Sequence, residues 1–454
     1  MPDSGEGDFA RSTGPVAPVL GRLIRSRLHP WLPQLVVAVF AGFLAYLAFT
    51  PVRHAEFNVA AGVLWKLWWP GLALLVLVAG PIWCAVCPGG AAADLAEKSR
   101  ARRGARRHAP PRWLRRWGPA VGTATVVAAG IGFLAFGLES SAMWAGVFLL
   151  GIPAVAFAFS LRGSGRPFCR YVCPVGTMVR TYSSLSLLGL RPGEKDRLSP
   201  GICPAGEAPT RLAPFSRCYL CGACTKEAGG PVPSFALPRR YWRGRMSVWD
   251  ARVVAILLGL AVADLVRMTP LHPAYVRRLY PILGSFEAAT ALGALAVTAV
   301  VAGGVLLAAR SMAGRTGAAA GAGTSLARTL TPLAFGTFVV LGLQHIWGTG
   351  GAVVRAVLLE VGALTGFGHL PPSTTYTVVP VLKVLQFAIL GAAVVLAARS
   401  ARASAAVALN GPGRNAPAPG TRGAGGSGAV LMFAPAAITV VLASLIALPM
   451  SSAC

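Results

Sequence analysis

Cys218-Tyr-Leu-Cys221-Gly-Ala-Cys224 is a run of three thiols at two-residue spacing, and it lies in the one long polar segment of an otherwise apolar chain. Such a loop can supply three thiolates to three corners of an iron–sulfur cluster, so a fourth thiolate must come from elsewhere. No thiol follows the run closely, and the nearest Cys-Pro lies upstream, at Cys203-Pro204. The run predicts a 4Fe-4S cluster, with a structural zinc site or disulfides as the alternatives.

The composition around this run is that of a membrane protein. Hydrophobic residues make up 55% of the 454 residues and charged residues only 13%, a balance typical of polytopic membrane proteins. The net charge of +27 does not indicate nucleic-acid binding, because the basic residues form short clusters between apolar spans and no nucleic-acid-binding motif accompanies them. We expect an all-α polytopic membrane protein whose surroundings are the lipid bilayer.

The hydropathy pattern predicts about nine transmembrane helices. They lie near residues 34–51, 63–83, 118–138, 142–161, 252–268, 286–309, 329–347, 376–398 and 429–449. The heaviest arginine loops fall on one side, which the positive-inside rule assigns to the cytoplasm, so we expect a cytoplasmic (inner) membrane protein with its iron–sulfur region inside. The second span carries Trp65, Trp68 and Trp69, interpreted as an interfacial belt, and residues 352–366 are interpreted as an interfacial or re-entrant helix.

The expected organisation has six parts. They are a disordered basic tail over 1–32, a four-helix membrane region over 33–176, a small irregular ferredoxin-like cytoplasmic segment over 177–250, a second four-helix membrane region over 251–399, a flexible linker over 400–427 and a final transmembrane helix over 428–454.

The first two apolar hairpins end alike. The first ends in Trp83-Cys84-Ala-Val-Cys87-Pro88 and the second in Phe168-Cys169-Arg-Tyr-Val-Cys173-Pro174-Val-Gly176. The similarity indicates a duplicated unit that delivers thiols to one face of the membrane. A proline after a cysteine turns the chain away just beyond the ligand, as in ferredoxin loops. The competing interpretations of these cysteines are buried free thiols, a dithiol redox pair or another metal site.

These hairpin endings, followed by a ferredoxin-like cysteine run, resemble the membrane-bound 4Fe-4S polyferredoxins. That family includes the quinol-linked iron–sulfur membrane subunits of periplasmic nitrate reductase and the membrane proteins that support nitrous oxide reductase. The resemblance covers residues 34 to 235 and implies a 4Fe-4S electron carrier fixed at the inner membrane face. The chain departs from the family in its shorter first pair, C-x2-C-P, and in having one C-x2-C-x2-C run where relatives usually have two ferredoxin motifs.

Eight cysteines on the predicted cytoplasmic side can supply two sets of four ligands, so one or two 4Fe-4S clusters are expected. The simplest assignment gives one cluster the loop thiols, Cys203, Cys218, Cys221 and Cys224, and the other cluster the hairpin thiols, Cys84, Cys87, Cys169 and Cys173. Cys173 and Cys203 can exchange in this scheme, because a Cys-Pro ligand crosses to the other cluster in two-cluster ferredoxins. Cys454, at the extreme C-terminus, is assigned no part in cluster binding.

The sequence favours an electron-transfer component over a stand-alone catalyst, since no catalytic nucleophile or acid–base pair stands out. The expected function is to pass electrons between a quinone or soluble redox partner and a membrane or extracytoplasmic acceptor. The alternatives are an accessory protein for maturation or reactivation of a metalloenzyme, and a redox-sensing or metal-handling membrane protein.

Polar residues in the later spans are costly in lipid and therefore invite a functional interpretation. Gln344, His345 and Lys383 form a candidate quinone pocket. The simpler alternative is that these residues are structural: Lys383 extends to the interface or binds a carbonyl, and Asp264 pairs with Arg267 one turn away.

Overall fold

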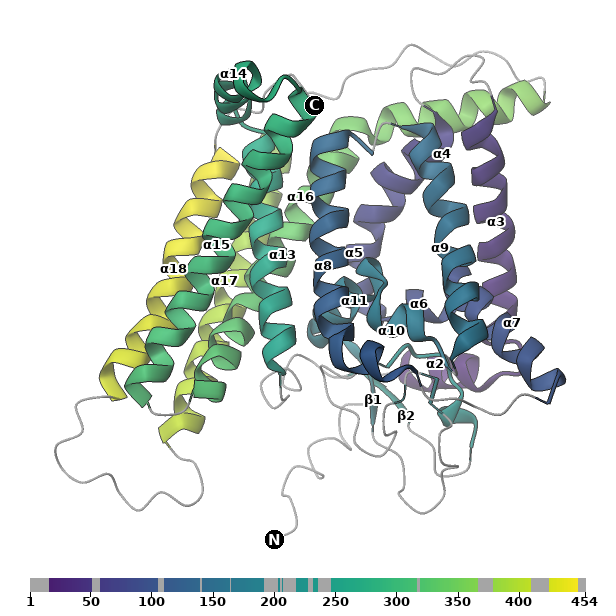
Figure 1. Cartoon of the computed structure of the whole chain (residues 1–454), viewed down its shortest axis with the longest axis horizontal. Coiled ribbons are helices and arrows are strands. Elements are labelled where there is room, and N and C mark those ends of the chain that lie inside the picture. Colours follow the sequence, from purple (N-terminus) through teal and green to yellow (C-terminus); the bar gives the residue numbers. More distant parts are fainter. Residues whose placement is uncertain are drawn as a thin grey trace, which may run out of the picture.

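The computed structural model describes residues 16–50, 58–104, 110–138, 141–163, 165–191, 203–204, 206, 218–227, 232–235, 246–316, 319–365, 379–409 and 424–447. Within these residues the chain forms two neighbouring groups of long helices, with short helices and a two-stranded sheet gathered at one end (Figure 1). Nearly every described residue outside the turns is helical, as expected for an all-α polytopic protein.

Seven helices in the described part of the chain are long and apolar enough to cross a membrane. An eighth span arises if α13 (Val248–Arg267) and α14 (Leu271–Leu283), which meet at 90°, count as one bent crossing. The last helix, α18 (Ala424–Ala447), has a shorter apolar part, Ala434–Ala447. The protein is therefore a multi-pass membrane protein by helix length and composition, and the number nine stays a prediction.

The N-terminal group of helices leads into the two hairpin endings. It consists of α3 (Trp31–Phe49), α4 (Val59–Ala61), the π-helical segment η1 (Gly62–Trp68), α5 (Trp69–Ala79), α8 (Arg112–Phe136) and α9 (Ala142–Arg162). Trp65, in η1, is 6% exposed, and its ring centroid lies 5.1 Å from that of Phe148 and 5.7 Å from that of Phe133. The expected interfacial belt is thus wrong for Trp65, which packs inside the helix group.

The C-terminal group consists of α13, α14, α15 (Phe286–Thr316), α16 (Ala319–Thr365), α17 (Val379–Leu409) and α18. Helix α13 packs closely against α15, because a Cβ added at Gly259 would lie 2.8 Å from the Thr298 carbonyl oxygen. The largest hydrophobic core includes residues of α5, α11, α13, α16 and α17, so the two groups share one core. Beyond the apolar stretch Thr324–Ile346, α16 runs along the upper edge of Figure 1, and its Val353 side chain lies against Gly62.

The small unit at the lower end of Figure 1 contains the eight cysteines of the described residues. Its helices are α6 (Ile82–Val86), α7 (Pro88–Arg102), α10 (Pro167–Tyr171), α11 (Pro174–Tyr182) and the 3-10 turns η2 (Ser183–Leu185) and η5 (Cys224–Lys226). Strands β1 (Leu188–Arg191) and β2 (Val232–Phe235) pair antiparallel, with Leu188 opposite Phe235 and Arg191 opposite Val232.

Two expected flexible regions differ from the structure. The tail expected to be disordered over 1–32 contains helix α2 (Val16–Arg25), which packs against the small unit, while residues 1–15 lie outside the described residues. The expected linker over 400–427 is narrower, because α17 continues to Leu409 and α18 begins at Ala424. The first difference comes from a separate short helix, and the second from helices that extend beyond the apolar stretches by which the sequence was divided.

Candidate metal centre

The two hairpin endings fold in the same way. A five-residue helix carries the first cysteine of each pair, Cys84 in α6 and Cys169 in α10. The second cysteine, Cys87 or Cys173, directly precedes a helix whose first residue is proline. Proline suits this position, because its fixed φ matches the helix and its missing N–H is not needed there. The repeat therefore sets two cysteines, Cys87 and Cys173, each at a helix N-terminus.

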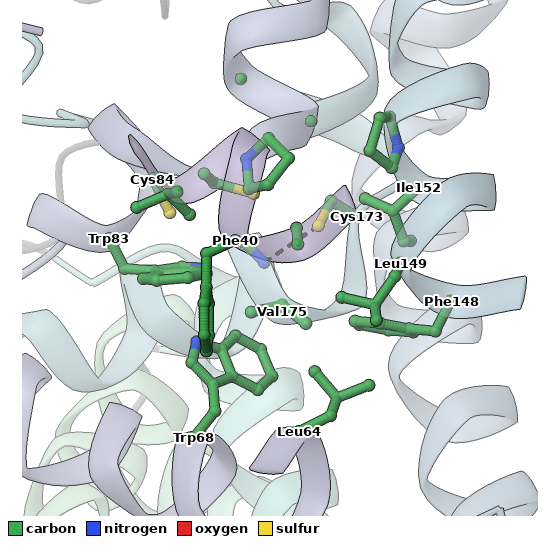
Figure 2. Close-up of a pocket in the computed structure, with 18 of the residues that line it drawn as sticks. Phe40, Leu64, Trp68, Trp83, Cys84, Phe148, Leu149, Ile152, Cys173 and Val175 are labelled. Atoms are coloured by element: carbon green, nitrogen blue, oxygen red, sulfur yellow. Dashed lines mark hydrogen bonds between the residues drawn. The ribbon is translucent and has the colours of Figure 1, made fainter. Parts of the chain in front are cut away.

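The four hairpin thiols line one cavity of about 100 Å³. They are Cys84, Cys87, Cys169 and Cys173, and all four are free cysteines. Figure 2 shows Cys84 and Cys173 at this cavity, with the rings of Trp83, Phe40 and Trp68 beside it. Apolar side chains of α3, η1 and α9 complete the wall, so the cavity has almost no polar lining except the thiols.

Backbone N–H groups face the sulfurs at the two helix N-termini. The N–H of Gly176 donates to Cys173 Sγ at 3.3 Å, and the N–H groups of Gly89 and Gly90 interact with Cys87. Hydrogen bonds from N–H groups and the positive end of a helix dipole both stabilise a thiolate. These contacts make the site suited to anionic sulfur ligands in an otherwise apolar wall.

The loop thiols line a second, smaller cavity of about 10 Å³. They are Cys203, Cys218, Cys221 and Cys224. The loop reverses sharply, since Leu220 has a φ of 53° and Gly222 a φ of 76°, and the N–H of Leu220 donates to Cys218 Sγ at 3.4 Å. The structure thus groups the eight thiols as in the simplest assignment, with Cys173 in one set and Cys203 in the other. That these sets bind iron stays a prediction.

The number of thiols at each cavity fits the ligand count of a 4Fe-4S cluster. Four cysteines bind such a cluster, each through a different iron atom. Four cysteines can also bind a single zinc ion in a tetrahedral site. Across the described ranges, no three His, Cys, Asp or Glu side chains are gathered closely enough to hold one metal ion.

Burial favours the neutral form of Cys169 and of Cys224 in the absence of metal. It raises the pKa of Cys169 to about 12, against the opposing effect of the Arg166 guanidinium, and raises the pKa of Cys224 to about 12 as well. Ligation by thiolates must therefore displace protons from both sites.

An ion pair between a buried arginine and a half-buried aspartate, which the sequence did not single out, lies beside the thiols. The side chain of Arg166 is 1% exposed; its Nε donates to Asp94 Oδ1 at 2.9 Å and its Nη2 to Asp94 Oδ2 at 2.7 Å. Gln34 Nε2 donates to Asp94 Oδ2 at 3.0 Å and to the carbonyl oxygen of Ala85 at 2.9 Å. The one signal in the sequence is that Asp94 is an acidic residue in a strongly basic loop.

The N-terminal segment packs against the cysteine loop. Ile24, 1% exposed, and His29, 3% exposed, both lie against Gly222. His29 Nε2 is 3.2 Å from the Leu220 carbonyl oxygen, and Lys226 Nζ donates to the carbonyl of His29. A segment near residue 25 therefore contacts a loop near residue 220, which the spacing of these residues in the sequence does not reveal.

The residues of the expected quinone pocket make different contacts, and the pocket that they were expected to form stays a prediction. Lys383 Nζ donates to the carbonyl of Ile446 on α18, as in the structural alternative. His345 lies with its ring centroid 6.5 Å from that of Phe133, and Gln344 is 7% exposed with no hydrogen-bond partner found for its Oε1 in the described structure. Asp264 pairs with Arg267 at 3.2 Å, which confirms the pairing expected between them.

Comparison with known proteins identifies one domain type. A family model described as a 4Fe-4S binding domain matches residues 61–106 and 144–191, the segments that contain the two hairpin endings and all four hairpin thiols. The match supports an iron–sulfur protein of ferredoxin type and agrees with the repeat seen in the structure. The loop thiols lie outside the matched residues. No curated protein and no solved structure is significantly similar to the chain.

Proposed function

We propose that the protein is a membrane-anchored electron-transfer protein with two 4Fe-4S clusters, one held by the hairpin thiols and the other by the loop thiols. The observation that carries this proposal is the convergence of eight free cysteines into two sets of four, each around its own cavity. A bound 4Fe-4S cluster supplies one-electron transfer, at a potential set by its charge, hydrogen bonds and exposure.

The chain's own residues hold and shield the clusters in this proposal. Cys87 and Cys173 ligate from helix N-termini, where N–H groups offset negative charge on sulfur. Trp83, Trp68 and Phe40 exclude water from the hairpin thiols, and the N-terminal segment excludes it from the loop thiols. By the arginine distribution, both sites face the cytoplasm at the inner membrane, as in the polyferredoxins that the sequence resembles.

The electron partner in this proposal is a quinone or a soluble redox protein. A third cavity, of about 180 Å³, lies between the two helix groups and is lined by aromatic rings, among them those of Trp69 and Tyr182. Val175, next to Cys173-Pro174, lines both this cavity and that of the hairpin thiols. A quinone ring in this third cavity would lie next to the hairpin site, with His345 against its wall through Phe133.

Iron and sulfide content, together with EPR spectra of the dithionite-reduced protein purified without oxygen, tests the cluster assignment. Two clusters correspond to about eight irons per chain. Cys221→Ser should remove the signal of the loop site and Cys87→Ser that of the hairpin site, each leaving the other. About four irons in fully loaded protein would refute the second cluster, and zinc without iron would refute the function.

Quinol-driven reduction of the clusters tests the proposed partner. The rate should fall in a His345→Ala variant with unchanged iron content, while reduction by dithionite stays normal. An unchanged quinol rate would leave His345 without a part in electron flow.

A further inference from the structure

Arg166 is positioned between the two thiol sets. Its Nη1 donates to the carbonyl oxygen of Cys84 at 2.6 Å, on the hairpin side. Its backbone N–H donates to the carbonyl oxygen of Pro204 at 3.3 Å, next to Cys203 on the loop side. The guanidinium also lies 5.7 Å from the ring centroid of Tyr219, the residue after Cys218. One residue therefore contacts segments that carry ligands of both sets.

The charge of Arg166 is fixed in place and shielded from water. The two bonds to Asp94 hold the guanidinium plane in a bidentate arrangement, and Gln34 in turn holds Asp94. There is no space beside it, because a Cβ added at Gly90 would lie 2.7 Å from Arg166 Nη1. In such a buried position a charge acts on its neighbours with much less screening than at the surface.

The ion pair lies close to ligand-bearing segments of both sets. The Arg166 guanidinium binds the carbonyl oxygen of Cys84 on the hairpin side and lies by the ring of Tyr219, next to Cys218, on the loop side. The Asp94 carboxylate lies 2.7 Å from the same guanidinium. Because the two charges have opposite signs, they have opposite electrostatic effects on anionic groups near them.

We propose that Arg166 is a positioning residue shared by the two clusters, whose buried positive charge raises the reduction potential of both. The inference rests on the proposed function, in which the two thiol sets bind clusters. Adding an electron makes a cluster and its thiolates more negative, so a fixed cation nearby stabilises the reduced form more than the oxidised form. Asp94 holds the guanidinium in place and partly offsets its charge, so the pair sets both potentials together.

The test compares midpoint potentials of the full-length protein from redox titrations followed by EPR, with iron content measured alongside. Arg166→Gln should shift both potentials to more negative values. Asp94→Asn should shift both to more positive values, because it removes the opposing charge. Arg166→Lys should lie closest to the unaltered protein, because it keeps the charge although it loses the bidentate geometry. Arg162→Gln is the matched control, since Arg162 is exposed at the end of α9, and both potentials should stay unchanged.

Shifts of the midpoint potentials in opposite directions in Arg166→Gln and Asp94→Asn support the inference, because a purely structural role would give both variants the same defect. Unchanged potentials in variants that keep their iron overturn it, as do shifts of the same sign. If the Arg166→Gln variant loses its iron, the potentials of Asp94→Asn and Arg166→Lys test the inference instead. Loss of iron in all three variants overturns it and means that Arg166 serves folding alone. Absence of clusters from the unaltered protein would instead refute the proposed function.

Discussion

Replacing Gly118 with alanine should displace the helix that carries Cys169, although Gly118 itself does not line the hairpin cavity. Gly118, on α8, is buried against Tyr171, which lies between Cys169 and Cys173. A Cβ at this position would lie 2.8 Å from Tyr171 Cγ and 3.0 Å from Cε1, and closer still to Cδ1. Ordinary contacts between carbon atoms are about 3.5–4.0 Å, so the ring must move, and α10 with it.

The expected cost can be isolated with a matched glycine. Overpacking of this kind costs about 1–3 kcal/mol. Alanine also gains about 1 kcal/mol over glycine in helix propensity. Gly151→Ala, on α9, has the same propensity gain but no atom within 4 Å of the added Cβ. The free energy of unfolding should therefore differ by about 1–3 kcal/mol between the two variants.

Iron content, the two EPR signals and thermal unfolding in detergent measure the effect. Gly118→Ala should lose the hairpin-site signal first, while the loop-site signal persists, and Gly151→Ala should keep both. Equal stability and two intact signals in both variants would refute the packing of α8 on α10 as the support of the hairpin thiols.

Two further predictions concern the loop thiols. Gly222→Ala should lower the free energy of unfolding by about 1–2 kcal/mol, because Gly222 has a left-handed φ. The added Cβ would also lie 2.8 Å from the Ile24 carbonyl oxygen, so the EPR signal of the loop site should fall. The control is Gly284→Ala, because Gly284 has a φ of 67° but open space around the added Cβ. Burial lowers the pKa of His29 from its ordinary 6.5, with the Leu220 carbonyl opposing and Lys226 adding to the shift. Protonation of His29 therefore favours a state in which the N-terminal segment has detached from the cysteine loop. Resistance of the loop site to chelators should be complete above about pH 6.5 and should fall below that pH. The same pH dependence in a His29→Gln variant would contradict this prediction.

The sequence was most informative about the cysteines, because short motifs carry their own local geometry. Cys-Pro predicts a turn of the chain just beyond the cysteine, and at Cys87 and Cys173 the structure begins a helix at that proline. Long apolar stretches likewise predicted the seven candidate spans of the described residues, because a bilayer requires them, while the number nine stays a prediction. In both cases the determining interactions lie within a few residues or with the lipid.

The residues that pack around the two thiol sets could not be predicted from the sequence, because they come from segments that are distant along the chain. Arg166 and Asp94 are 72 residues apart, and an arginine in a basic chain gives no sign that it is buried. Helix α2 is short and begins in a Pro- and Gly-rich tail, so its local pattern resembles disorder until the cysteine loop packs against Ile24. Trp65 was misplaced because aromatic residues near a span end suit an interface and a helix packing contact equally well.

The repeated hairpin endings also impose an order on biogenesis. Translation releases Cys84 and Cys87 well before Cys169 and Cys173, so the hairpin cavity closes only once the fourth apolar helix has left the insertion machinery. Until then the first pair of thiols is an exposed, incomplete chelate at the membrane surface. The loop cavity closes later still, when the nascent chain passes Cys224 and folds back beneath a segment made at the very beginning of synthesis. In the proposed two-cluster protein, the order of synthesis therefore completes the hairpin cavity before the loop cavity.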